Sequence, residues 1–65
     1  MSDYALLSTT IKEIDKLRDD QLSHLANGGA KSFDEYRHVC GVIRGLTHAE
    51  SIIKDLVQRS EMSDD

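Results

Sequence analysis

Cys40 and the three histidines are the residues of this 65-residue chain that could hold a metal ion. A structural zinc site needs four nitrogen or sulfur ligands, usually in closely spaced pairs. His38 and Cys40 are two residues apart, so on a helix they point in different directions. His24 and His48 lie far from both, and no His-x3-His or Cys-x2-Cys pair occurs. The spacing therefore predicts no metal site and no cofactor.

The same cysteine is a poor candidate for catalysis. A cysteine nucleophile needs a base within hydrogen-bond reach and a pocket that excludes water. Two helices cannot easily enclose such a pocket, and the carboxylates are spread over polar faces. A single cysteine also excludes an internal disulfide. We therefore expect no enzymatic activity and assign Cys40 to the edge of an apolar seam.

The composition narrows the class of protein. The formal net charge of −4 argues against a protein that binds nucleic acid by releasing counterions. With 38% hydrophobic residues the chain is too apolar for plain disorder. No apolar run approaches the roughly 18 residues needed to span a bilayer, and residues 1–3 do not open a signal peptide. We expect a soluble, cytoplasmic domain without membrane contact.

Capping signals divide the chain into two helices. Asn27, Gly28 and Gly29 favour the left-handed conformation that ends helices. Ser32 and Glu35 form a capping box, in which the hydroxyl and the carboxylate each accept a bond from a free amide at a helix start. The first helix could begin after Ser2 or after Thr10, and we favour the earlier start. We predict one all-α domain over residues 1–65: helix about 3–26, turn 27–32, antiparallel helix about 33–60, acidic tail 61–65.

Apolar residues at helical spacing predict the seam between these helices. Two polar residues, Arg18 and Gln21, interrupt the first stripe, and Glu50 occupies a core position of the second. A buried carboxylate needs a partner, and Arg18 is the only base in the first stripe. We expect Arg18 and Glu50 to approach each other, within one hairpin or between subunits. The predicted hairpin core is Leu7, Ile11, Ile14, Leu22, Leu25, Tyr36, Val39, Ile43, Leu46, Ile53 and Val57.

The second helix carries another apolar strip, away from that seam. It consists of Gly41, Gly45, Ala49, Ile52 and Leu56. Interior glycines cost about 1 kcal/mol each relative to alanine, and they let another helix approach closely. That helix could be the first helix of the same chain or a helix of another chain; a bend or a ligand contact is a third possibility. One short companion helix covers only one face, so we expect a homo-oligomer, a dimer or larger, such as a four-helix bundle with the second helix central.

A narrow polar wedge holds Arg37, Arg44 and His48. Such a wedge could contact a phosphate or an acidic protein surface. Ordinary surface ion pairs, such as Arg44 with Asp34 or Glu50, explain the same residues, and each is worth little. The net negative charge and the scarcity of aromatic residues favour the ion-pair interpretation.

Residues 32–46, SFDEYRHVCGVIRGL, resemble a segment of short uncharacterised proteins of tailed bacteriophages, particularly T7-like podoviruses. In those proteins a similar segment starts the second of two helices. The resemblance covers residues 28–58 and implies a viral origin, with a role in the virion or in the host cytoplasm. It supplies no catalytic or ligand residue. We expect a non-enzymatic interaction or structural module, such as a minor virion or assembly component; the alternatives are a factor that inhibits a host protein and a nucleic-acid-binding regulator.

Overall fold

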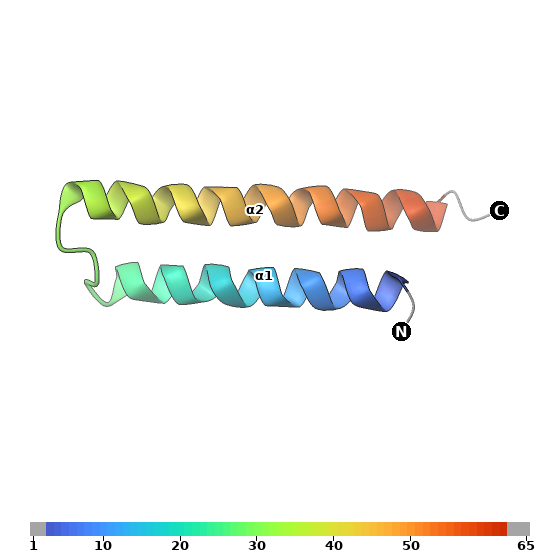
Figure 1. Cartoon of the computed structure of the whole chain (residues 1–65), viewed down its shortest axis with the longest axis horizontal. Coiled ribbons are helices and arrows are strands. Elements are labelled where there is room, and N and C mark those ends of the chain that lie inside the picture. The colour runs from blue at the N-terminus through green and yellow to red at the C-terminus, as the bar shows by residue number, and fades with distance from the viewer. Residues whose placement is uncertain (1–2, 63–65) are drawn as a thin grey trace.

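The computed structural model describes residues 3–62, which form two α-helices and no strand. Helix α1 spans Asp3–Ala26 and helix α2 spans Phe33–Met62. They lie side by side and run in opposite directions, so the start of α1 and the end of α2 lie at the same end of the molecule (Figure 1). The predicted all-α antiparallel hairpin is confirmed. Within the described residues, neither helix combines the length and the apolarity needed to cross a membrane.

The helix bounds follow the local signals closely, with one difference. The predicted start of α1 at Asp3 is confirmed. Within α1, the hydroxyls of Thr9 and Thr10 donate to the carbonyls of Ala5 and Leu6, one turn earlier. Helix α2 continues to Met62, two residues beyond the predicted end, so part of the predicted tail is helical. The rest of that tail, residues 63–65, lies outside the described residues.

A Schellman motif ends α1. The Gly28 amide donates to the Leu25 carbonyl at 3.1 Å, and the Gly29 amide donates to the His24 carbonyl at 2.7 Å. This pair of hydrogen bonds requires the first residue after the helix to adopt the left-handed conformation. Gly28 is that residue, with φ of 71°. A Cβ atom at Gly29 would collide with the imidazole ring of His24. The two glycines at the predicted end of the helix are therefore needed for different reasons: Gly28 for its left-handed backbone and Gly29 for the space beside His24.

Ser32 caps the start of α2. The Glu35 amide donates to the Ser32 hydroxyl at 3.1 Å, as in a capping box. The Glu35 carboxylate accepts from the amide of Lys31 at 3.0 Å, one residue earlier than the predicted partner. Both interactions fix the point at which the chain enters α2, and they position the two helices for packing.

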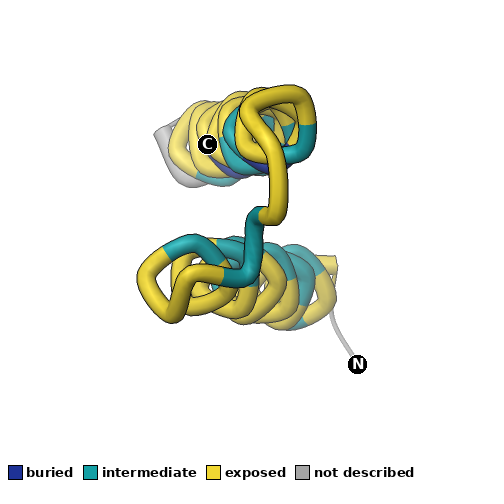
Figure 2. Tube along the Cα trace, turned by 90° about the vertical axis from the view of Figure 1, so that its left-hand side faces the viewer, coloured by how far each residue is buried: buried dark blue, intermediate teal, exposed yellow. Residues whose placement is uncertain are grey.

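The hairpin is one layer thick and has a thin core. Its principal extents are 52 × 18 × 13 Å. Figure 2 shows the buried and half-buried segments facing the space between the helices, with exposed segments outside. Among the described side chains only Val39 and Glu50 are buried, at 5% and 6% exposure. The other seam residues are half-buried: Leu7, Ile11, Ile14, Leu25, Ile43, Leu46, Ile53 and Val57.

Two residues assigned to the core are exposed instead. Leu22 is 46% exposed and Tyr36 is 47% exposed. Each directly follows a residue of the seam, Gln21 or Glu35, so its side chain stands beside the contact between the helices. A heptad pattern drifts by about 20° per repeat on a straight helix. Because Tyr36 lies three repeats before Val57, this drift places it beside the contact between the helices rather than within it.

Candidate interaction surface

One side of the hairpin carries exposed apolar residues from both helices. On a helix, the residue before a seam residue lies on one side of the seam, and the residue after it lies on the other. Because α1 and α2 are antiparallel and both right-handed, the residues that precede the seam on each helix share one side of the hairpin. We call this side the apolar side face; it comprises Leu6, Leu17, Gly45, Ala49, Ile52 and Leu56.

The large residues of the apolar side face are open to solvent. Ile52 is 59% exposed and Leu56 is 47% exposed, while Leu6 and Leu17 of α1 are 56% and 53% exposed. On α1 the face is interrupted by Thr10, Glu13 and Asp20, which also directly precede seam residues. Helix α1 therefore leaves the second strip of α2 uncovered, as expected of a helix with two apolar faces. Both α2 side chains face solvent in the single chain that the structure describes.

The two glycines of the strip do not pack against α1. A Cβ atom added to Gly41 or Gly45 meets nothing within 4 Å. Ala49, the third member of the row, is half-buried. Close packing of the two glycines against the first helix of the same chain is therefore wrong, because α1 packs on a different face of α2. A contact with another chain, and a bend or a ligand contact, are the two expectations that remain consistent with their open surface.

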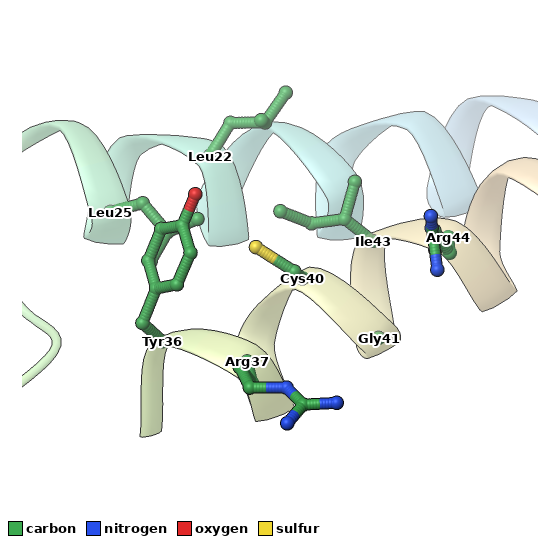
Figure 3. A pocket seen from close by; sticks show the side chains of 8 residues that line it. All are labelled: Leu22, Leu25, Tyr36, Arg37, Cys40, Gly41, Ile43 and Arg44. Carbon is green, nitrogen blue, oxygen red and sulfur yellow. The ribbon is translucent and has the colours of Figure 1, made fainter. Parts of the chain in front are cut away.

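A groove near the turn opens on the opposite side of the hairpin and extends around α2 to Gly41, which stands at the edge of the strip. It has a volume of about 700 Å³ and is lined by Leu22, Leu25, Tyr36, Arg37, Cys40, Gly41, Ile43 and Arg44. In Figure 3 the Tyr36 hydroxyl and the Cys40 sulfur both point toward α1, while the Arg37 side chain points away from it. The groove is therefore apolar on its inner wall, with a guanidinium at its outer edge.

Tyr36 interacts with its neighbours in α2. Hydrogen bonding with Cys40, the charge of the Cys40 thiolate and slight desolvation, in that order, raise the pKa of Tyr36 above its usual value. Its ring stacks on Phe33, with ring centroids 6.3 Å apart. The Arg37 guanidinium lies 5.9 Å from the centre of the Phe33 ring. The predicted position of Cys40 at the edge of the seam matches its half-buried state.

A cluster of four charges crosses the seam. Arg18 donates to Glu50 Oε1 at 3.3 Å and to Asp15 at 2.7 Å. Lys54 donates to the same Glu50 oxygen at 3.0 Å. The Glu50 side chain is only 7% exposed, and its Oε2 is buried without a hydrogen-bond partner. The predicted approach of Arg18 and Glu50 is confirmed within one hairpin, and it ties one helix to the other.

The other polar candidates are scattered. His24 lies 3.9 Å from Glu35 across the turn, an ion pair only if the imidazole is protonated. Glu50 pairs with Arg18 and Lys54, so the suggested pairing of Arg44 with Glu50 is wrong. Arg44 and His48 instead line a shallow hollow of about 520 Å³ with Gly45. Within residues 3–62, no three histidine, cysteine or acidic side chains gather in a way that could hold a metal ion.

The chain matches no family model, no curated protein and no solved structure. The candidate surface is therefore defined by geometry. Of the predicted interaction residues, Gly41, Gly45, Ile52 and Leu56 are exposed. The interpretation of the sequence missed Leu6 and Leu17. Their signal was available, since each directly precedes a seam position, Leu7 or Arg18, as Ile52 and Leu56 precede Ile53 and Val57.

Proposed function

We propose that this chain is a non-enzymatic structural module that acts by associating with copies of itself through the apolar side face. The observation that carries the proposal is the exposure of four large aliphatic side chains on one side of the hairpin: Leu6, Leu17, Ile52 and Leu56. Exposed large apolar side chains gathered on one side of a small protein are typical of a site of contact with another molecule. The opposite side is charged around Asp15 and Lys54 and carries the exposed Leu22 and Tyr36 near the turn.

The amount of exposed surface supports the same proposal. The chain exposes 5154 Å². A compact monomer of 7.3 kDa is expected to expose about 4,200 Å². The elongated hairpin, 52 Å long and 13–18 Å across, therefore exposes more surface than a compact protein of its mass. A single hairpin with so thin a core gains stability by covering this surface.

Sedimentation equilibrium of matched variants tests the proposal. Ile52→Lys places a charge on the apolar side face, and Thr47→Lys places the same charge at an exposed position on the other side of α2. We expect a mass of at least two chains at low micromolar concentration for the parent and for Thr47→Lys, and a loss of association for Ile52→Lys. A single-chain mass for the parent, or equal masses for both variants, contradicts the proposal.

Salt separates self-association from the alternative partners. Each chain carries a formal net charge of −4, so copies repel one another and added salt strengthens their association. Binding to a basic host protein, or to nucleic acid through Arg37 and Arg44, weakens as salt rises. Binding that weakens as salt rises therefore indicates a host-protein inhibitor or a nucleic-acid-binding regulator, and association that strengthens with salt indicates self-association.

Within this proposal, the resemblance of residues 28–58 to short bacteriophage proteins suggests the setting. A self-associating module of a phage would serve in the virion or during its assembly. Mass spectrometry of purified particles, together with affinity purification from infected cells, tests this setting. Stoichiometric amounts in particles support a virion component. Absence from particles together with recovery of one host protein supports the inhibitor instead.

A further inference from the structure

We infer that two copies of this chain pair α2 against α2 in an antiparallel arrangement about a two-fold axis close to Ala49. In that arrangement Gly41 and Gly45 of one copy receive Leu56 and Ile52 of the other. This inference rests on the proposed self-association and adds its geometry. It names a second copy as the molecule that covers the apolar side face.

The strip on α2 is divided into a small half and a large half. Gly41 and Gly45 stand toward the turn, and Ile52 and Leu56 stand toward the chain ends, with Ala49 between them. Each pair has a spacing of four residues, which is about 6 Å along a helix. An axis between positions 48 and 49 therefore places Ile52 opposite Gly45 and Leu56 opposite Gly41 at the same time. The strip is complementary to itself when one copy is reversed.

The open surface at the glycines fits this arrangement. Nothing in the chain lies within 4 Å of a Cβ placed on Gly41 or Gly45, while Ile52 and Leu56 project 59% and 47% exposed. One half of the strip thus offers shallow positions and the other half offers side chains to fill them. A parallel pairing in register would set Ile52 on Ile52, which holds the helices apart, and would leave Gly41 and Gly45 opposite glycine with no side chain to fill the space.

Charges at the two ends of the strip favour the same direction. Asp34 lies seven residues before Gly41, and Arg59 lies seven residues after Ile52, so both share the face of the strip. Both are exposed, and His38 lies between Asp34 and the first glycine. At this register the antiparallel pairing sets Arg59 of one copy opposite His38 of the other, one helical turn from Asp34. The parallel pairing sets like charges against each other at both ends.

Cysteine cross-linking of the full chain tests the direction. In a Cys40→Ala background, Ala49→Cys puts a thiol beside the axis, about 8 Å from its copy if the helices touch. Arg59→Cys puts a thiol on the same face but about 30 Å from its copy in the antiparallel pair. Under copper–phenanthroline oxidation we expect Ala49→Cys to form covalent dimers at least tenfold faster than Arg59→Cys. A mixture of Gly41→Cys and Leu56→Cys chains should form the mixed dimer faster than either self-dimer.

Sedimentation of the same samples before oxidation separates the possible failures. Dimers that cross-link preferentially at Ala49→Cys, with the mixed dimer favoured, support the antiparallel pair. Dimers that cross-link equally well at Arg59→Cys, or not at Ala49→Cys, overturn this geometry and leave self-association in place. A single-chain mass for the parent and the variants overturns both the geometry and the proposed function.

Discussion

The charge cluster in the seam supports a specific prediction about stability. Replacing Arg18 by methionine leaves the nearly buried Glu50 carboxylate without its partner on α1. Removing one member of a buried ion pair costs about 3–5 kcal/mol. Lys54 remains 3.0 Å from Glu50, and the Arg18 side chain is itself 24% exposed, so the loss is smaller here. We expect Arg18→Met to destabilise the hairpin by about 2 kcal/mol.

The double variant Arg18→Met/Glu50→Leu should recover that loss. It removes both charges and also the buried Glu50 oxygen that has no hydrogen-bond partner. Apolar replacement of a buried ion pair is commonly neutral or stabilising, by up to about 4 kcal/mol. A simple exchange of the two charges is a weaker test. It sets the relocated guanidinium beside Lys54 and the relocated carboxylate beside Asp15, so like charges oppose the rescue.

Urea unfolding followed by circular dichroism measures these changes. Association contributes to the apparent stability, so each variant is compared with the parent at equal chain concentration. Lys16→Met is the matched control, because it removes a positive charge from an exposed position of α1. We expect the control to lie within about 0.5 kcal/mol of the parent. An unchanged stability of Arg18→Met, or a double variant weaker than the single one, refutes the reasoning.

Three further predictions follow from individual contacts. Gly28→Ala forces a side chain into the left-handed conformation with φ of 71° and should lower the free energy of unfolding by about 1–2 kcal/mol in the same assay; an unchanged value contradicts the Schellman cap. Gly45→Ala meets open space within its own helix, so it should stabilise the dissociated chain by about 1 kcal/mol in thermal unfolding at high dilution; a lower midpoint contradicts that environment. In a Tyr4→Phe background, alkaline titration at 295 nm should show the pKa of Tyr36 falling toward its usual value on Cys40→Ala. An identical titration with and without Cys40 contradicts the Tyr36–Cys40 contact. Because the pKa of Tyr36 is raised in the folded chain, the stability that Tyr36 contributes is present below pH about 10 and is lost as the pH rises through the pKa of Tyr36 in the folded chain.

Local signals in the sequence predict most of the fold. The stop after Ala26 and the start at Phe33 depend on residues within one turn of each boundary, such as Gly28 and Ser32, so they can be read without knowing the rest of the structure. The pairing of Arg18 with Glu50 was also predictable. Each stripe contains one charge that needs a partner, and the two charges have opposite signs.

The environment of each face could not be predicted in the same way. Whether Gly41 and Gly45 contact α1 depends on how far α2 is rotated about its axis, and the spacing of the strip does not determine that rotation. Leu6 and Leu17 were missed because a search for one stripe on α1 ignores the residues beside it. Tyr36 was misassigned because a heptad pattern drifts on a straight helix over three repeats.

The mass of the parent chain in solution tests the central idea most directly, namely that Ile52 and Leu56 on α2 are covered by another molecule of the same kind. Sedimentation equilibrium at low micromolar concentration and at two salt concentrations measures that mass. We expect at least twice the 7.3 kDa of one chain, with tighter association at the higher salt. A single 7.3 kDa species at both salt concentrations contradicts the account.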